Sequence, residues 1–507
     1  MTSEEKAKSA MQQTTVKPNV VNFGYATFLS IGATSIWGGV FPYLADVYRT
    51  SSTTTAFYLL QGTAMCLAFV CAMRMAWTHP RYVTDAHVWS FSVPLALGPV
   101  LLIAAMYLEV ATPALVAIAA LLVGGGLAGY MISWQRVFAS LDSAQGTAAL
   151  ISGTAYSAVL YFTLCLIPAA LCAYLIPLVL VPLAGLCLSL AARQTSSDQP
   201  MFEDVPCEHA AVYRNVIRKS LAGALSVGAL GFCAGAARFI AITHQELLNI
   251  INISSMFSLL VAVALFYRIW RTRTITFSLT AFYRVLFPVA ALCMIILPFA
   301  GRSFVGAGIA VTHACFMLAC VLMMMLCAQI SRDSGINPVF IYAIYALFAY
   351  ALQTLGYVVG FASGLASSVG LEQLSLVGLL SLFVLLVASL AGRKDPELHT
   401  DRLEFITLAE TASSGSEPIP MPEPRAEEPA VDRLASQCRA VSSRYGLTTR
   451  ETEVMELIAR GHSGPAIAEM LFISENTMRT HSKRIYAKLG IHKKQELIVL
   501  LEGFAAR

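Results

Sequence analysis

Residues 447–491, LTTRETEVMELIARGHSGPAIAEMLFISENTMRTHSKRIYAKLGI, hold the start and stop signals of three short helices in succession. Thr448 and Glu451 have the spacing of a capping box, in which the two side chains satisfy free backbone amides at the start of a helix. Gly461 and Gly490 each follow an apolar-periodic stretch and tolerate the left-handed conformation that ends many helices. This stretch therefore predicts a small helical domain near the end of the chain.

The third of these helices, expected from about Ser474 to Leu489, has two different faces. Its apolar face should be buried and consists of Met478, Ile485 and Leu489. Its opposite face is basic and short-chained, and consists of Arg479, Thr480, Lys483 and Ala487. Basic donors reach base edges in the major groove of DNA, and small side chains let the helix backbone approach. The pattern favours a recognition helix over the alternative of a basic face that is only solvated.

A final helix is expected from about 493 to 504. Leu497, Ile498 and Leu501 lie on one of its faces. We expect these three side chains to bury between two copies of the chain, because a two-fold dimer reads two related half-sites.

The segment resembles the LuxR-type helix-turn-helix domain. The matching motifs are L-T-x-R-E-x-E-V at 447–454, Gly461, I-A-x-x-L at 467–471, and S-x-x-T-M-R-T-H followed by K-L-G-I within 474–491. The resemblance covers about sixty of the 507 residues and implies a four-helix domain over 441–507 that binds double-stranded DNA. It implies that bases are read by Arg479, Thr480 and Lys483, and that phosphates lie near Thr477, His481 and Lys488.

This sequence departs from the LuxR-type pattern at three places. The second helix opens with Gly464-Pro465-Ala466 instead of polar residues, which removes a phosphate contact. Met478 replaces the common Val, a change that a core tolerates well because methionine adapts its shape. Lys493 stands where a Ser or Asn usually caps the last helix.

The rest of the chain has the composition of a membrane protein. The whole sequence is 57% hydrophobic and 13% charged, with a mean hydropathy of +0.67, whereas soluble proteins average about a quarter charged residues. Apolar stretches long enough to cross a bilayer occur approximately at 23–45, 54–77, 87–108, 112–134, 144–167, 169–191, 220–242, 247–268, 275–298, 304–328, 337–362 and 372–391. The block 144–191 is divided only near Pro168, so eleven spans are an alternative to twelve.

The expected fold class is all-α: a polytopic transmembrane bundle of about twelve spans, six plus six, followed by the four-helix domain. A retained cytoplasmic leader covers 1–20, and the transmembrane domain covers 21–391. Its halves, 21–191 and 220–391, are joined by a loop at 192–219. This layout resembles the major facilitator superfamily, although 78–85, THPRYVTD, does not match that family's Gly/Asp/Arg-rich signature loop. The Pro-rich, acidic stretch 392–440 cannot bury a core and is predicted to be a disordered linker.

Loop charges predict the orientation of the spans. With the N-terminus inside, the cytoplasmic loops hold most of the basic residues, whereas the opposite side and the spans hold only Arg49, Arg238, Arg284 and Arg302. The positive-inside rule then places both termini in the cytoplasm. We expect a multi-pass protein of the bacterial cell membrane.

Ionisable groups inside spans are costly and therefore mark candidate functional sites. Arg238, Arg284 and His313 are the ligand candidates, with neutral polarity added by Gln61, Asn249, Asn252, Gln329 and Gln353. Helix–helix hydrogen bonds, or an internal salt bridge from Arg238 to Glu109 or Asp46, explain the same residues equally well. The run Gly124, Gly125, Gly126 and Gly129 is predicted to allow close helix packing.

The sequence contains no catalytic motif, and we expect no enzyme, no metal site and no cofactor. The twelve cysteines form no C-x-x-C pair, and ten of them lie in apolar spans as small packing residues. Taken together, the chain looks like a membrane-spanning LuxR-type regulator that senses an unknown small molecule in the bilayer domain and binds promoter DNA as a homodimer. Two alternatives remain open: a major facilitator-like solute or drug transporter with a regulatory DNA-binding tail, and a tethered DNA anchor without a ligand.

Overall fold

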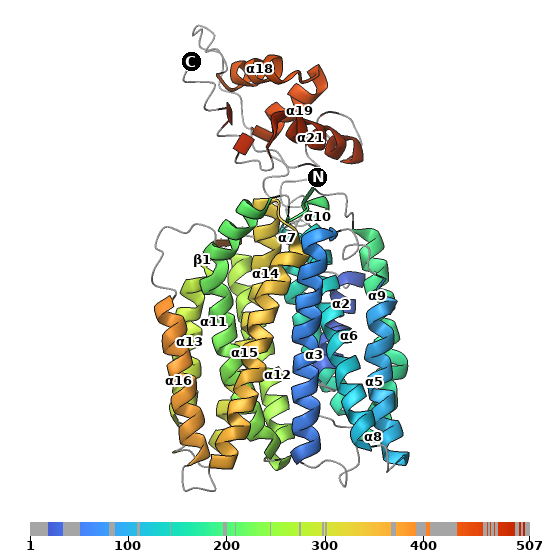
Figure 1. Ribbon diagram of the computed structural model, residues 1–507, viewed down its shortest axis with the longest axis vertical. Coiled ribbons are helices and arrows are strands. Elements are labelled where there is room, and N and C mark those ends of the chain that lie inside the picture. The colour runs from blue at the N-terminus through green and yellow to red at the C-terminus, as the bar shows by residue number, and fades with distance from the viewer. Residues whose placement is uncertain are drawn as a thin grey trace, which may run out of the picture.

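The structure is a computed structural model that describes residues 19–33, 51–80, 87–108, 112–141, 143–195, 200–207, 209–243, 245–272, 275–296, 299, 302–366, 372–391, 402–405, 433–459, 464, 467, 471, 475–491, 496–497 and 500–501. In the first half the helices are α2 (Val20–Gly32), α3 (Ser51–Thr78), α5 (Trp89–Tyr107), α6 (Thr112–Ser140), α7 (Ser143–Cys165), and a last span of α8 (Ala169–Leu175), the π-helical turn η4 (Ile176–Leu180) and α9 (Val181–Gln194). After the short α10 (Pro200–Glu203), the second half consists of α11 (Ala210–Thr243), α12 (Gln245–Thr272), α13 (Leu279–Ile296), α14 (Arg302–Ser334), α15 (Pro338–Ala366) and α16 (Gln373–Ala391). Figure 1 shows these helices side by side in one bundle.

Each predicted span overlaps a helix of the bundle, although the span predicted from 275 begins in a helix only at Leu279, and residues 34–45 of the first span lie outside the described residues. Within the described residues, nine helices are long and apolar enough to cross a membrane, and three shorter apolar helices cover Val20–Gly32, Trp89–Ala105 and Val285–Ile296. Pro168 lies at the N-cap of α8 and separates it from α7, so the block 144–191 contains two spans. The predicted all-α fold with six plus six spans is confirmed over the part of the chain that the structure describes.

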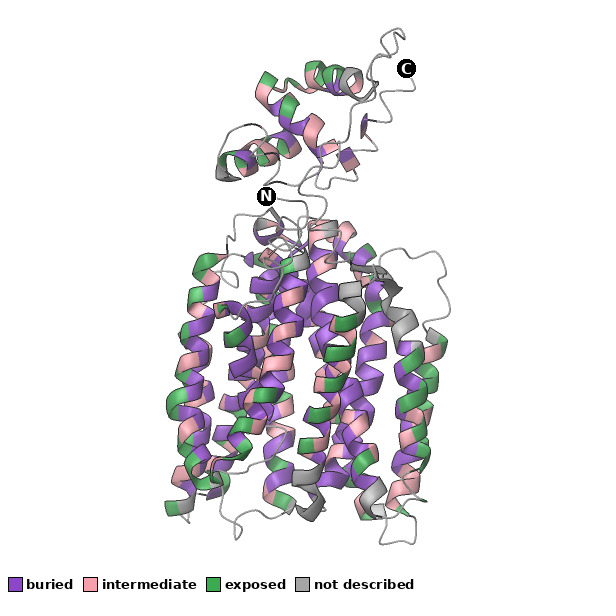
Figure 2. Cartoon of the chain, turned by 180° about the vertical axis from the view of Figure 1, so that it is seen from behind, coloured by how far each residue is buried: buried purple, intermediate pink, exposed green. Residues whose placement is uncertain are grey.

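The outward faces of the bundle are apolar and exposed, as contact with lipid requires. Leu178, Val285 and Phe383 are each 63% exposed. Figure 2 shows that exposed residues gather on the outer faces of the helices and buried residues between them. Because lipid tails offer no hydrogen bonds, each span satisfies its backbone groups internally, and packing between spans depends on side-chain shape.

The glycine run on α6 lets this helix approach its neighbours closely. A Cβ at Gly124 would overlap the carbonyl oxygen of Gln61 on α3, and Cβ atoms at Gly126 and Gly129 would overlap α5. The predicted packing role is confirmed at these three positions. Gly125 differs, because a Cβ there would meet no atom of the part of the chain that the structure describes within 4 Å.

Hydrogen bonds join the two halves at the end of the bundle where α10 lies. Arg332, near the end of α14, donates from Nη1 to the carbonyl oxygens of Phe138 at 3.2 Å and Leu141 at 3.1 Å. These carbonyls belong to the open C-terminus of α6. The guanidinium therefore caps a helix of the first half from the second half. Nearby, Gln135 Nε2 donates to the carbonyl oxygen of Met324 at 3.3 Å.

The connection between the halves packs onto both of them. Met201 and Phe202 of α10 are buried in one cluster with Ala139 of α6 and Ala328 of α14. Because one short helix contacts both halves, any separation of α6 from α14 at this end must also displace α10.

A small polar network anchors the same connection to α11 and α15. Tyr213 Oη donates to Asp204 Oδ2 at 2.6 Å and accepts the backbone N–H of Asn337 at 2.7 Å, and His209 Nδ1 lies 2.8 Å from Asp204 Oδ1. Burial and the hydrogen bond to Asp204 raise the pKa of Tyr213. The hydroxyl therefore stays protonated and remains a donor at neutral pH.

Two short strands lie outside the bundle's helices. β1 (Ile275–Ser278), between α12 and α13, pairs antiparallel with β2 (Arg402–Phe405), with Ile275 opposite Phe405. The prediction of a wholly disordered linker over 392–440 was wrong at β2. Apolar and polar residues alternate in both strands, which is the pattern of a strand.

The same prediction was wrong at the other end of the linker, where α18 (Arg433–Tyr445) begins. Cys438, Val441 and Tyr445 recur there at helical spacing. Cys438 and Val441 are fully buried. Gly446, with φ +65°, ends this helix.

The tail, residues 433–501, has a core of its own that joins α18 to α19 (Thr449–Ala459) and α21 (Glu475–Leu489). Its buried members are Cys438, Val441, Val454, Met455, Ile458, Ile467, Met478, Ile485, Leu489, Ile491, Leu497 and Leu501. Because this core contains tail residues alone, the tail is expected to fold by itself.

The predicted helix signals of the tail are confirmed where the structure describes them. The backbone N–H of Glu451 donates to Thr448 Oγ1 at 3.3 Å, and that of Thr448 donates to Glu451 Oε2 at 2.8 Å. Gly490 has φ +66°, and the N–H of Ile491 donates to the carbonyl oxygen of Tyr486 at 3.1 Å. The capping box thus opens α19, and a left-handed glycine ends α21.

One ion pair, buried on its Glu451 side and exposed on its Lys488 side, fixes α21 to the start of α19. Lys488 Nζ donates to Glu451 Oε2 at 2.7 Å and to the carbonyl oxygen of Gly446 at 3.0 Å. Burial alone would raise the pKa of Glu451, but hydrogen bonds from Lys488 and Thr448 hold it below its ordinary value. The carboxylate therefore serves the capping box and the contact between helices at once.

Two members of the stripe predicted as a dimer seam lie in this core. Leu497 is 0% and Leu501 2% exposed within a single chain. Ile498 lies outside the described residues. The leucines therefore have no surface left for a second copy, because α18, which the sequence reading missed, supplies additional core for them to pack with.

We expect Arg332→Met to lower the melting temperature of the full chain in detergent by several degrees, because hydrogen bonds from a charged donor contribute roughly 1.5–3 kcal/mol each. Intrinsic fluorescence during heating measures it. Arg193→Met, at the exposed end of α9, is the matched control. Equal melting of the two variants would mean that the contact between halves does not stabilise the bundle.

We expect Glu451→Gln to destabilise the isolated tail, residues 430–507, by about 1–3 kcal/mol at pH 7, as loss of charged hydrogen bonds does. Since the folded pKa is lowered, this stabilisation is complete above the unfolded value of about 4.3 and is lost as the pH falls through the folded value. Urea unfolding should therefore separate variant and wild type at pH 7 and less at pH 3. The exposed Glu453→Gln should cost at most about 1 kcal/mol, and an equal loss there would count against the ion pair of Glu451 with Lys488.

We expect Leu497→Glu to unfold the tail, because a carboxylate in an apolar core without a partner costs several kcal/mol. Circular dichroism of the isolated tail measures this, with the exposed Ala487→Glu as control. A folded Leu497→Glu tail that no longer pairs on DNA would restore the dimer seam.

Candidate nucleic-acid interface and membrane cavity

Helix α21 presents the two faces predicted for it. The apolar face is buried, since Met478, Ile485 and Leu489 are at most 8% exposed, which confirms the predicted stripe. On the other face Thr480, Lys483 and Ala487 are exposed, while Arg479 is half-buried. The predicted base-reading side chains therefore share one accessible surface.

The residues expected near phosphates have different surroundings. Thr477 is exposed and His481 is half-buried, and Nδ1 of His481 has no hydrogen-bond partner among the described residues. Lys488 uses two of its three N–H donors inside the tail, on Glu451 and Gly446. Its first role is thus to hold α21 against α19, and one donor remains for a phosphate.

Two of the departures from the LuxR-type pattern lie next to each other. A Cβ at Gly464 would lie 2.5 Å from Met478 Cε, the flexible end of the methionine side chain. Gly464 therefore packs against the methionine on the buried face of α21.

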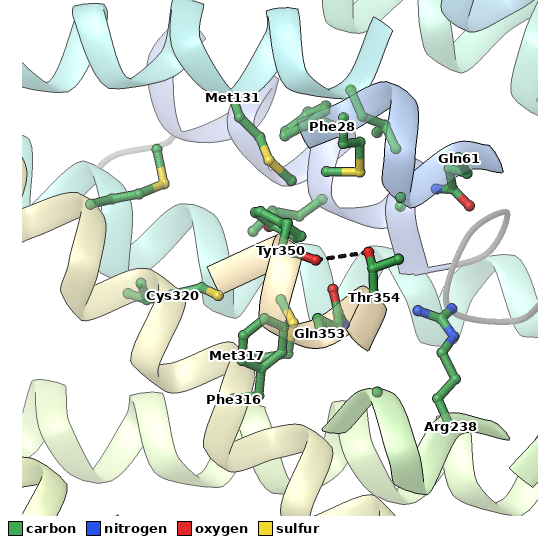
Figure 3. A pocket seen from close by; sticks show the side chains of 18 of the residues that line it. Phe28, Gln61, Met131, Arg238, Phe316, Met317, Cys320, Tyr350, Gln353 and Thr354 are labelled. Carbon is green, nitrogen blue, oxygen red and sulfur yellow. Dashed lines mark hydrogen bonds between the residues drawn. The ribbon is translucent and has the colours of Figure 1, made fainter. Parts of the chain in front are cut away.

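A cavity of about 110 Å³, open to water-sized molecules, lies at the interface of the two halves (Figure 3). Its walls come from α2, α3, α6 and α7 of the first half and from α11, α12, α14 and α15 of the second. A single water molecule needs about 10–15 Å³ of such space, so this cavity has room for a small organic molecule.

One end of the cavity is polar. Arg238 Nη2 donates to Tyr58 Oη at 3.4 Å, and Arg238 Cζ lies 4.5 Å from the centre of the Tyr58 ring, a cation–π contact. Gln61 is 3% exposed, and its Oε1 has no hydrogen-bond partner among the described residues. One turn before Arg238, a Cβ at Gly235 would overlap the carbonyl oxygen of Gln353, so α11 and α15 meet closely behind this polar group.

The other end is apolar and rich in sulfur and rings. Figure 3 shows Phe28, Met131, Phe316, Met317 and Cys320 around it, away from Arg238 and Gln61. Methionine and aromatic rings are polarizable and adapt to the shape of an apolar partner. The cavity as a whole is therefore amphipathic.

Of the three predicted ligand candidates, the structure brings only Arg238 to this cavity. His313 on α14 is not among the described residues that line it. Arg284 belongs to α13, which contributes none of them; its side chain lies outside the described part of the chain. Figure 1 shows α13 beside α16 at the edge of the bundle. The salt-bridge partners considered for Arg238, Asp46 and Glu109, also lie outside the described residues.

Sequence reasoning found Gln61 and Gln353 but missed the other polar side chains of the lining. These are Tyr25, Tyr58, Thr154, Ser157, Tyr342, Tyr350, Thr354 and Tyr357. Tyrosine, serine and threonine occur throughout the spans of this chain, so only the packing of the helices distinguishes the residues that face the cavity.

Comparison with known proteins identifies the tail. Residues 446–501 match the model of the bacterial regulatory proteins, luxR family. Over 71 residues the chain is 41% identical to the uncharacterized response regulatory protein YgeK of Escherichia coli (strain K12). This match covers 13% of this chain and 48% of that protein. Over 52 residues it is 44% identical to the oxygen regulatory protein NreC of Staphylococcus aureus (strain JH9), covering 10% and 24%. The chain thus spans about half the length of the first relative and about a quarter of the second.

Solved structures resemble the bundle. A crystal structure of a bacterial homologue of the iron transporter ferroportin in the outward-facing state has a TM-score of 0.53 and 13% identity, covering 74% of this chain and 98% of that one. The same homologue with soaked iron gives a TM-score of 0.51 and 14% identity. At this identity the likeness concerns the fold. The chain therefore joins a membrane domain that shares the fold of this ferroportin homologue to a tail whose residues 446–501 match the luxR family model.

Proposed function

We propose that the chain is a membrane-embedded one-component transcription regulator. A small molecule binds in the cavity, and the tail binds promoter DNA through α21. The observation that carries the proposal is the presence, in one chain, of a LuxR-family domain and a membrane cavity walled by both halves.

The position of the cavity supports a sensing role. A ligand that touches both halves binds different arrangements of them with different affinity, and this difference is what shifts an equilibrium between two states. A ligand would need to prefer one state by about 10⁴-fold to move its population from 1:99 to 99:1. The contacts of Arg332 and α10 at one end of the bundle are the ones that a change between halves would break.

A tail that binds DNA requires a cytoplasmic C-terminus, and the loop charges support the same orientation. Binding as a homodimer on a two-half-site operator follows the geometry of helix-turn-helix regulators. The burial of Leu497 and Leu501 within one tail favours a dimer surface that does not consist of these two leucines.

The transporter-like fold favours one rival, a solute transporter with a regulatory tail. Flux assays on a chain that lacks residues 433–507 distinguish the two. Substrate movement across vesicles would support the transporter, whereas a sensor gives none.

DNA contact by α21 is tested on the isolated tail. We expect Arg479→Ala and Lys483→Ala each to weaken binding to a specific operator by about 1–3 kcal/mol, as loss of a base contact does. Gel shifts with specific and random duplexes measure it, after genome-wide mapping of bound sites supplies the operator. Equal losses on both duplexes would assign these side chains to phosphates.

Sensing through the cavity is tested by filling it. Gly32 lines the cavity, and a Cβ there meets no atom of the described residues within 4 Å. We expect Gly32→Leu to raise the half-maximal concentration of any compound that changes a reporter promoter by at least about tenfold, roughly 1.4 kcal/mol of binding. Gly125→Leu, equally roomy but outside the lining, is the matched control. A reporter that answers no compound in a broad library would indicate a DNA anchor without a ligand.

A further inference from the structure

The charge of the cavity selects against cations. Among the described residues that line it, Arg238 carries the only full charge at neutral pH, and none is acidic. Apolar walls of low dielectric strengthen the field of such a charge compared with water. An anionic group is therefore the favoured neighbour for the guanidinium, whose Cζ already lies 4.5 Å from the centre of the Tyr58 ring and whose planar fork matches a carboxylate.

Gln61 adds a second requirement. It is 3% exposed and lines the same end of the cavity, and its Oε1 lacks a hydrogen-bond partner among the described residues. A buried acceptor left without a donor is costly. A ligand that carries a hydroxyl or N–H group removes this cost. Figure 3 shows Gln61, on α3, and Arg238, on α11, at the same side of the cavity.

The remaining wall defines the body of the ligand. Phe28, Phe316, Met131 and Met317 offer ring faces and thioethers, which pack well against a flat, polarizable hydrocarbon. A fully polar ligand would displace water from these side chains without packing against them.

We propose that the cavity binds an organic anion: a carboxylate held by Arg238, a hydroxyl or N–H donor received by Gln61, and an aromatic or otherwise apolar body between Phe28 and Phe316. This inference rests on the proposed function, because it assumes that the cavity is the ligand site. It goes beyond that function by fixing the chemical class of the ligand.

The test compares matched probes on the full chain purified in detergent. The first series is 6-hydroxy-2-naphthoate, its primary amide, the corresponding naphthylmethylammonium, and 6-methoxy-2-naphthoate. Two further series contain the same four kinds of compound, built on 4-hydroxyphenylacetate and on 10-hydroxydecanoate. Isothermal calorimetry gives each Kd without DNA. In at least one series the carboxylate should bind at least about tenfold more tightly than its amide, and the ammonium should not bind. Equal binding of acid and amide in all three series overturns the proposal.

Variants assign the preference to residues. Arg238→Gln should abolish the difference between acid and amide, and Arg238→Lys should keep part of it. Gln61→Leu should remove the preference for hydroxy over methoxy probe while the acid remains favoured over the amide. The exposed Arg193→Gln is the control and should bind as wild type. If Arg238→Gln does not fold, the acid preference of the wild type and the hydroxy preference of Gln61→Leu still test the ligand class. If Arg238→Gln folds and still prefers the acid to the amide, the assignment of the carboxylate to Arg238 is overturned.

The outcome is separable from that of the proposed function. Tight binding of a carboxylate without any reporter response would overturn sensing and leave the ligand class intact. A reporter that responds to compounds whose amides bind equally well would leave sensing intact and overturn the ligand class.

Discussion

The absence of water in the bilayer core is the constraint on which the structure depends. Each backbone N–H and C=O must be bonded within its own segment, so the spans are helices, and apolar attraction between them is weak because lipid is equally apolar. Close approach at glycines such as Gly124 and Gly235 then supplies the packing. Polar groups cannot face lipid cheaply. Arg238 and Gln61 accordingly lie inside, at the boundary between the halves, where the two walls enclose a cavity.

Much of this fold is predictable from the sequence because the signals are local. Apolar length places the spans, and the spacing of Thr448 and Glu451 places the start of α19. The elements that sequence reasoning missed have short or weak signals. Helix α18 is indicated only by the helical spacing of a few apolar residues, among them Cys438 and Val441. Strand β2 forms by pairing with β1, which lies far away in the chain.

The candidate sites divide in the same way. The faces of α21 follow from its helical period, so Arg479 and Lys483 could be grouped from sequence alone. The cavity depends on tertiary packing: Arg238 and His313 are equally unusual residues for a span, yet only Arg238 is a described part of the lining. Lys488 is a case in the tail where tertiary packing decides the role of a side chain, because its partner Glu451 is 37 residues away in sequence. No local pattern distinguishes such a lysine from one that binds phosphate.

The pairing of β2 with β1 shortens the tether of the DNA-binding domain. Between β2 and α18 lie residues 406–432, and that length of chain spans at most roughly 100 Å when fully extended, at about 3.3–3.6 Å per residue. This length bounds the distance of the tail from its own bundle, so under the proposed function an operator must come within that reach. Two tails that read one operator require two bundles to be neighbours in the bilayer. Lateral diffusion in the membrane, together with the position of the chromosome, then enters the rate at which a promoter is found.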